Sequence, residues 1–368
     1  MMKVGVVGCG VVGAAIAYEL SRVDGLNVTL FDRQTPASGS TAAALGVLMG
    51  AISQKTKGRS WRLREASLRR YDSLIAELNE ITQQELPYNQ QGILKLRFAE
   101  EDGDRWKKLI QVRNSQGWNL ELWDLVSLRE KCPQLQNDQI VGAVYSPQDR
   151  QVDPTALTQA LVTAARINGV NCQFGLELQN FATTTVTGSN EQICQQIYTP
   201  DQAYDIDWLV ISAGLGSLNL TTSLNQKVDI RPVLGQALHI KLKQPLGNPN
   251  FQPVITGDDV HLVPLGNQEY WLGATVEFPD NTDEIKPNNS LLTQVKNQAI
   301  SFCPALADAT ILRSWSGKRP RPEGQSAPII SKLTGYRNVL LATGHYRNGV
   351  LLAPATALQI KAMILENN

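Results

Sequence analysis

Glycines near the N-terminus form a G-x-G-x-x-G pattern that could hold a pyrophosphate. The pattern consists of Gly8, Gly10, Val11, Val12 and Gly13. It follows the apolar segment 4–7, predicted as a strand, and opens a helix predicted over residues 11–23. The glycines allow a tight turn, close approach of the backbone to phosphates, and close packing of helix on strand. With Asp32, at the end of the next apolar segment, placed to bind a ribose, the pattern predicts a site for NAD or FAD.

Two other segments favour FAD. The small residues of segment 40–47 would let the backbone approach a flat ring. Segment 341–349 ends a predicted strand and leads into a helix expected to carry Pro354 in its first turn, where proline is favoured. The N-terminus of that helix would stabilise negative charge on a reduced flavin ring.

Length and composition set the class of protein. The 368 residues are 42% hydrophobic and 18% charged, and 34 basic residues balance 34 acidic ones, so nothing predicts binding to nucleic acid or an anionic membrane. The five cysteines and three histidines are scattered, so neither a metal site nor a disulfide framework is expected. The glycines within residues 1–20 argue against a signal peptide, and no apolar run reaches the length of an integral membrane segment. We expect a soluble, cytoplasmic α/β protein.

The order of predicted elements indicates two interleaved domains. Strands and helices alternate at both chain ends and over residues 153–215, while the intervening stretches are richer in hairpin-like strands. Segment 61–83 has the clearest amphipathic helical pattern, and the polar segment 179–202 is predicted as a hairpin. We assign residues 1–50, 140–224 and 312–368 to a dinucleotide-binding domain, and residues 51–139 and 225–311 to a substrate domain.

Several motifs in register resemble one enzyme family. These are the glycine pattern, the small-residue segment 40–47, and segments 152–154, 211–214, 231–236, 317–320 and 344–349. Their order resembles the D-amino-acid oxidase (DAO) superfamily of FAD enzymes, and most of all its glycine oxidase branch. The resemblance implies a Rossmann-type FAD-binding domain interleaved with a mixed α+β substrate domain. It also implies noncovalent FAD, since no cysteine lies between Ser314 and Ile330, where sarcosine oxidases tether their flavin.

The resemblance also implies which residues form the cofactor site beyond the glycine pattern and Asp32. They are Arg33, Ser40, Thr41, Ala43, Ala44, Gly46, Val47, Ala213, Gly214, Gly317, His345, Arg347, Asn348, Gly349, Val350 and Leu351. Of these, His345 is expected to pack within the flavin loop rather than to act as a base. Arg347 would touch flavin or substrate, with a structural salt bridge as the alternative.

Arg319 is the predicted substrate anchor, with Arg347 and His261 as further catalytic candidates. A guanidinium pairs with a carboxylate through two parallel hydrogen bonds, and Arg319 matches the family's G-x-R-P position. His261 stands where glycine oxidases tend to carry tyrosine, and Val276 and Val47 stand where they carry methionine. These departures predict a substrate other than glycine.

The resulting functional prediction is FAD-dependent oxidation of a small amino acid or secondary amine. As the resemblance implies, hydride would pass from the α-carbon to flavin N5, water would hydrolyse the imino acid, and oxygen would be reduced to hydrogen peroxide. One alternative is a dehydrogenase that uses a quinone or carrier protein as acceptor. Another is a noncatalytic flavoprotein that serves as an assembly factor. The sequence leaves homo-oligomerisation open.

Overall fold

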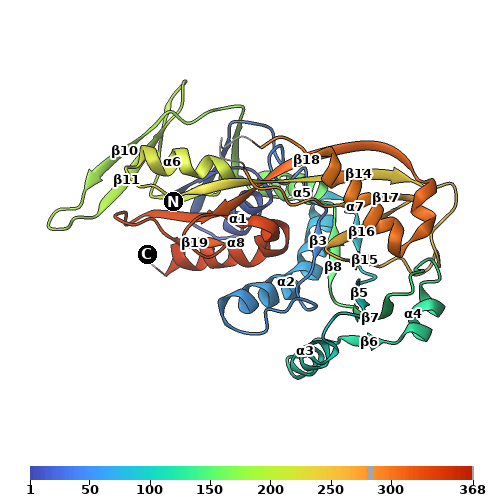
Figure 1. The fold of residues 1–368 in the computed structure, drawn as a ribbon. Helices are drawn as coiled ribbons and strands as arrows, with labels where there is room; N and C mark the ends of the chain where they lie inside the picture. The colour runs from blue at the N-terminus through green and yellow to red at the C-terminus, as the bar shows by residue number, and fades with distance from the viewer. Residues whose placement is uncertain (280–284, 367–368) are drawn as a thin grey trace.

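The computed structural model describes residues 1–279 and 285–366 and contains two large sheets (Figure 1). The first has six strands in the order β19-β20-β13-β1-β2-β9. Their bounds are β1 Met2–Val7, β2 Leu26–Asp32, β9 Asn171–Phe174, β13 Trp208–Ile211, β19 Ile329–Lys332 and β20 Val339–Thr343. All neighbours pair in parallel except β19 with β20. Because both faces of a parallel sheet are covered, its central strands are continuously apolar, and β13 and β20 are buried throughout.

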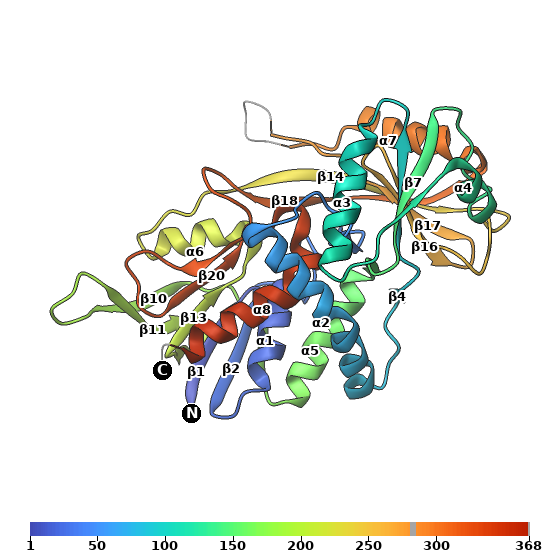
Figure 2. The ribbon, with the colours of Figure 1, turned by 90° about the horizontal axis from the view of Figure 1, so that it is seen from below.

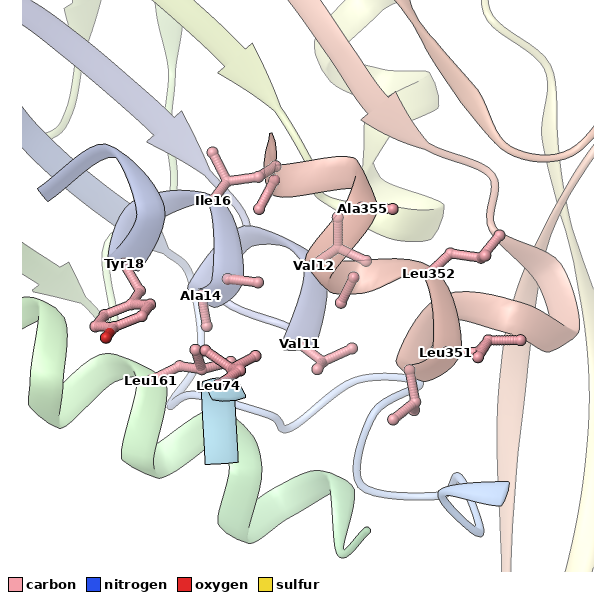
Figure 3. Close-up of a cluster of buried hydrophobic side chains, with 14 of the residues drawn as sticks. Val11, Val12, Ala14, Ile16, Tyr18, Leu74, Leu161, Leu351, Leu352 and Ala355 are labelled. Carbon is pink, nitrogen blue, oxygen red and sulfur yellow. The ribbon is translucent and has the colours of Figure 1, made fainter. Parts of the chain in front are cut away.

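Helices cover this sheet and build the main core. They are α1 Val11–Ser21, α2 Gly58–Thr82, α5 Pro154–Ile167 and α8 Gly349–Leu365. Helix α1 lies among the other three (Figure 2), and the small side chains on it allow close packing. Figure 3 shows Val12 of α1 beside Leu352 and Ala355 of α8, with Leu74 of α2 and Leu161 of α5 on the other side. This packing holds the glycine pattern and the start of α8 next to each other.

Helix α8 begins five residues before Pro354, so that proline is inside the helix and not in its first turn. A proline there lacks the N–H that would bond to the carbonyl of Val350, four residues earlier. The hydroxyl of Tyr71, on α2, donates to that carbonyl instead, and Ser67 Oγ accepts from the N–H of Ala355 over 3.2 Å. Helix α2 therefore supplies the hydrogen bonds that Pro354 disrupts, which the sequence pattern of α8 alone does not reveal.

The second sheet has eight strands in the order β18-β14-β17-β16-β15-β5-β7-β6. Their bounds are β5 Ile93–Phe98, β6 Glu121–Trp123, β7 Ile140–Ser146, β14 Ile230–Lys241, β15 Val254–Gly257, β16 Val260–Gly266, β17 Glu269–Gly273 and β18 Thr310–Pro322. Strands β14 and β18 form a long antiparallel pair that reaches from this sheet toward the first one (Figure 1). This pair carries side chains of the second sheet to the edge of the first, where the site lies.

Smaller elements complete the fold. They are the helices α3 Gly103–Ser115, α4 Leu125–Lys131, α6 Ser217–Ser223 and α7 Asn289–Phe302, and the 3₁₀ turns η1 Gly214–Gly216, η2 Pro304–Asp308 and η3 Tyr346–Asn348. A small sheet joins β3 Val47–Leu48, β8 Arg150–Val152 and β4 Tyr88–Asn89. The polar segment predicted as a hairpin forms one: β10 Asn180–Thr185 pairs with β11 Gln192–Tyr198, and β12 Ala203–Asp205 extends it.

Two segments differ from the predicted domain boundaries. Helix α2, assigned to the substrate domain, packs its buried face, including Trp61 and Leu78, into the core formed by α1, α5 and α8. Strand β7, assigned to the dinucleotide-binding domain, pairs with β5 and β6 in the eight-stranded sheet. Amphipathicity shows that a helix must bury one face but does not say against which sheet, and strand partners are set by long-range pairing.

One helical segment in the described residues, Tyr346–Leu365, is long and apolar enough by composition to span a membrane. It includes α8, and 56% of its most apolar window is buried inside the protein. Packing of α8 against α1 and α2 accounts for this apolar character, and a core helix meets the same criteria as a span.

Candidate active site

A cavity of about 640 Å³ runs along the carboxyl edge of the first sheet. At one end lie Asp32 and Glu177, at the other Arg319, His261 and the N-terminus of α8. The position agrees with the general rule that ligands of open α/β sheets bind beyond the carboxyl ends of the parallel strands. The end with Arg319 and Arg347 is thus basic, while at the other end Arg33 lies beside the two carboxylates.

The glycine turn has the geometry that the pattern predicts. Gly8 has φ +103°, and a Cβ there would lie 2.6 Å from the carbonyl oxygen of Ser212. A Cβ on Gly13 would lie 1.8 Å from the carbonyl oxygen of Gly8, so this residue permits close packing and does not itself line the cavity. Gly10 does line it, and a Cβ there would lie 3.1 Å from Thr41 Oγ1.

The first turn of α1 offers hydrogen-bond donors to an anion. The N–H of Val11 donates to Thr41 Oγ1 over 3.1 Å. Among residues 1–279 and 285–366, the N–H groups of Val12 and Gly13 have no acceptor. Donors at a helix N-terminus, together with the helix dipole, favour a phosphate.

Asp32 already accepts two backbone hydrogen bonds. Cys9 N donates to Oδ2 over 2.6 Å and Gln34 N to Oδ1 over 2.8 Å. These bonds fix the carboxylate at the cavity wall, and each oxygen retains a second lone pair for a ribose hydroxyl. Arg33, next to it, also lines the cavity and pairs with Glu177 over 3.6 Å.

Small residues keep the middle of the cavity open. Ala43, Ala44 and Val47 line it, and Gly317 of β18 approaches so closely that a Cβ there would lie 2.2 Å from Ala43 Cβ. Gly46 has φ +69°, and a Cβ there would lie 1.7 Å from the carbonyl oxygen of Val152. Segment 43–47 therefore packs closely against β18 and against Val152, and its small side chains leave the cavity open beside it.

Arg319 is fixed against the cavity wall by two backbone carbonyls. Its Nη1 donates to Leu234 O over 2.9 Å and its Nη2 to Thr275 O over 3.0 Å. The guanidinium lies directly over Gly235, where a Cβ would be 2.1 Å from Nη2. Burial and the nearby charge of Arg347 lower its pKa, but a guanidinium stays charged in proteins. Within residues 1–279 and 285–366, two of its five N–H groups have an acceptor, which leaves donors for a ligand.

Arg347 lies at the exposed rim of the same cavity. In the described part of the chain, no hydrogen-bond acceptor or ion-pair partner is recorded for its side chain, so the alternative of a structural salt bridge is not realised there. Its neighbour Tyr346 also lines the cavity and adopts φ +53°, a left-handed conformation that is uncommon outside glycine and often occurs at functional sites. Tyr346 is not among the site residues predicted from the sequence.

Both cavity histidines are held neutral. Burial, with the positive charges of Arg347 and Arg319 nearby, lowers the pKa of His261 to about 4, and its Nδ1 lies 2.9 Å from Thr256 Oγ1. Burial lowers the pKa of His345 to about 3, and its Nε2 lies 3.0 Å from Thr356 Oγ1 on α8. The bond to Thr356 agrees with the predicted packing role of His345.

The other predicted residues are placed as follows. Ser40, Ala213, Gly214, Gly349, Val350 and Leu351 line the cavity. Asn348 does not; its Oδ1 accepts from Arg64 Nη2 over 3.3 Å. Val276 is also absent from the lining, where Ala274 is the residue present. Strand β17 ends at Gly273, so Val276, which the resemblance to the family matches to a strand position, lies beyond the end of the strand.

Three residues that the sequence analysis did not select, Gly235, Gln236 and Lys318, also line the cavity. They lie on strands β14 and β18. Only the register in which these two strands pair shows which residues lie beside them. Gly235 and Gln236 belong to the family motif 231–236, and the glycine of this motif is the sequence signal that could have indicated a close approach there.

The cavity fits FAD by its chemistry. It offers a carboxylate for the ribose, free N–H groups for the pyrophosphate, and small residues where a flat ring would lie. At the far end, the first residues of α8 line the cavity, and the N-terminus of a helix favours negative charge nearby.

Sequence comparisons give consistent matches along the chain. A family model described as FAD dependent oxidoreductase (DAO) matches residues 3–363. The chain is 31% identical over 366 residues to the bifunctional protein ThiO/ThiG of Synechocystis sp., covering 98% of this chain and 51% of the relative. It is 26% identical over 361 residues to the glycine oxidase of Geobacillus kaustophilus, covering 98% of this chain and 92% of that enzyme. The chain thus spans about half the length of the bifunctional relative.

Solved structures match the fold over the whole chain. The crystal structure of glycine oxidase from Geobacillus kaustophilus has a TM-score of 0.84 at 26% identity and covers 100% of this chain and 95% of its own. Glycine oxidase from Bacillus cereus has a TM-score of 0.86 at 24% identity, covering 100% and 96%. At 24% identity the second match shows the fold alone.

Proposed function

The chain belongs to the DAO family of FAD-dependent oxidoreductases, and we propose that it oxidises a small amino acid or secondary amine that carries a carboxylate. The observation that carries this proposal is the position of Arg319. Its guanidinium is fixed by two carbonyls at the end of the cavity where the ring of FAD would lie, which leaves donors for a ligand. Such a group suits a carboxylate and would turn the neighbouring α-carbon toward the ring.

The chain's own residues would orient and desolvate the substrate. FAD, when bound, supplies the acceptor for the hydride that leaves the α-carbon. Arg319 would hold the carboxylate, and neutral His261 would offer a hydrogen bond without adding positive charge. No residue is required to act as a base if the amine binds uncharged. The imino acid product would then be hydrolysed by water to a keto acid and an amine.

We infer further that the preferred substrate is larger than glycine. His261 lines the cavity beside Ala274, where a tyrosine and a longer apolar side chain would fill more space. A smaller wall leaves room for a substituent on the α-carbon or the nitrogen, and one apolar contact is worth about 1 to 3 kcal/mol in discrimination. Val276 does not line the cavity, so it does not shape the space beside the substrate.

Oxygen as acceptor, a cytoplasmic location and the absence of a covalent flavin link belong to the same proposal. The five cysteines are free, as is typical of a reducing compartment. The bifunctional relative is about twice as long as this chain, so the activity of any longer protein that contains the chain is also part of the proposal.

The test is anaerobic mixing of the purified holoenzyme with glycine, sarcosine, proline and D-amino acids. Bleaching of the flavin absorption by a carboxylate-bearing amine supports the proposal, and its loss in Arg319→Ala with FAD still bound supports the anchor. Rapid recovery of colour in air with hydrogen peroxide formation identifies an oxidase, whereas slow recovery identifies a dehydrogenase that needs another acceptor. A flavin that none of these compounds reduces would contradict the proposal and favour a noncatalytic flavoprotein.

A further inference from the structure

A buried cluster of polar side chains lies directly behind Arg319. It consists of Gln236, Thr275 and Glu277, and we call it the Glu277 cluster. Glu277 is 6% exposed, and the other two are each 4% exposed. Nothing in the proposed reaction uses these side chains, and a carboxylate is rarely buried without a specific reason.

Three hydrogen bonds satisfy the carboxylate of Glu277. Thr275 Oγ1 and Gln236 Nε2 both donate to Oε1, the second over 2.9 Å, and the backbone N–H of Asn288 donates to Oε2 over 2.9 Å. Within residues 1–279 and 285–366, no lysine, arginine or histidine forms an ion pair with it. The negative charge of Glu277 is therefore not neutralised by direct contact with a cation there.

The cluster fixes both carbonyls that hold Arg319. Glu277 and Leu234 exchange two backbone hydrogen bonds, each 2.9 Å long, and Leu234 O also accepts from Arg319 Nη1. Thr275, whose carbonyl accepts from Nη2, is fixed by its hydroxyl bond to Glu277 and by two bonds with the backbone of Gln236, 2.8 and 3.1 Å long. The Glu277 side chain is therefore linked to one acceptor of the guanidinium, Thr275 O, through the Thr275 hydroxyl, while the Glu277 backbone holds the other, Leu234 O.

The charge of Glu277 also acts on Arg319. Burial and Arg347 both disfavour the charged guanidinium, while Tyr346 and, to a smaller extent, Glu277 favour it. Because Glu277 is buried, solvent weakens its interaction with Arg319 less than it would at the surface.

We propose that Glu277 is a positioning residue for Arg319, and that its carboxylate holds the guanidinium in the orientation that binds the substrate carboxylate. This inference rests on the proposed function, because it needs Arg319 to be the carboxylate anchor. Glu277 itself does not line the cavity and would not touch the substrate.

Equilibrium binding of acetate to the holoenzyme, followed by the change in the visible absorption of FAD, tests the inference without turnover. Glu277→Gln keeps the shape but replaces one acceptor oxygen by a donor amide, which then faces the donors of Gln236 or Asn288. We expect acetate to bind about 10-fold more weakly to this variant, with full FAD occupancy. In an Arg319→Met background, the same substitution should change the remaining acetate affinity less than about 2-fold, because the two residues act through one pathway.

Two further variants keep the result interpretable. Thr275→Val removes the hydroxyl that links Glu277 to the Arg319 acceptor, and it should weaken acetate binding in the same direction if Glu277→Gln does not fold. Glu269→Gln is the matched control, since Glu269 lies on β17 and bonds to His239 and Lys241 away from the cluster. It should leave acetate affinity unchanged.

Each outcome supports or overturns the inference. Equal weakening by Glu277→Gln in both backgrounds would show a general structural role, and no weakening by either cluster variant would show no role; both overturn it. If Arg319→Met alone does not weaken acetate binding, the proposed anchor fails first and the inference fails with it. Weakening that depends on Arg319 supports both.

Discussion

Replacing Gly235 by alanine tests whether the position of Arg319 determines substrate binding. Gly235 lies within β14 with an ordinary strand backbone, so alanine is acceptable there except for what its Cβ would meet. That Cβ would lie 2.1, 2.3 and 2.4 Å from Nη2, Nη1 and Cζ of Arg319. Since a normal contact is about 3.5 Å, the guanidinium must retreat by roughly 1 Å or more.

Such a shift stretches both hydrogen bonds that hold Arg319, which are now 2.9 and 3.0 Å long. A bond to a charged group is worth about 1.5 to 3 kcal/mol, and a 1 Å displacement at a reaction centre can lower the rate about 100-fold. We therefore expect Gly235→Ala to lower kcat/KM for a carboxylate-bearing amine about 100-fold and to weaken acetate binding. FAD occupancy should remain close to that of the wild type.

The assay is anaerobic reduction of the flavin over a range of substrate concentrations, with acetate titration as the equilibrium counterpart. Gly103→Ala, at the start of α3, is the control, because a Cβ there meets only the flexible end of Arg97, at 3.0 Å. If Gly235→Ala keeps both kcat/KM and acetate affinity within about 2-fold of the wild type, Arg319 does not anchor the substrate in the way described here.

Three other predictions concern α8 and the two cavity histidines. Tyr71→Phe removes the donor to the buried carbonyl of Val350. It should lower the free energy of unfolding by about 1 to 3 kcal/mol in denaturant titrations, without loss of activity per bound FAD. An unchanged midpoint would show that water or another donor replaces the hydroxyl. His345 has a pKa of about 3 in the folded protein but about 6.5 when unfolded, so between these pH values only the unfolded state gains a proton. The free energy of unfolding should therefore be full above about pH 6.5 and fall as the pH is lowered toward 3. His345→Asn should flatten this pH profile, and parallel profiles for the wild type and the variant would refute the assignment. His261→Tyr should shift the preference toward glycine by about 10-fold or more relative to larger amines, whereas Val276→Met, outside the cavity, should leave the ranking unchanged; a ranking that responds only to Val276→Met would reverse this assignment.

The sequence by itself determined the glycine turn and the strands and helix next to it. The glycine pattern, the following helix and Asp32 are contiguous, so their roles depend on local backbone geometry that a few residues dictate. The same holds for the amphipathic helix α2 and for the hairpin β10–β11, whose patterns were sufficient to predict them. The resemblance to known family motifs added the cofactor and the candidate anchor Arg319.

The tertiary structure alone decided which residues support that anchor and how the halves join. Arg319 is separated by 85 residues from the carbonyl of Leu234 and by 44 from that of Thr275. These contacts depend on the register of β14 with β18 and on the pairing of Thr275 with Gln236. The position of α2 on the core also depends on long-range contacts, as does the hydrogen bond from Tyr71 to the carbonyl of Val350, which Pro354 leaves without its helical donor. A periodic pattern specifies which face of an element is buried but not its partner, because many pairings bury the same apolar surface and only the assembled packing selects one.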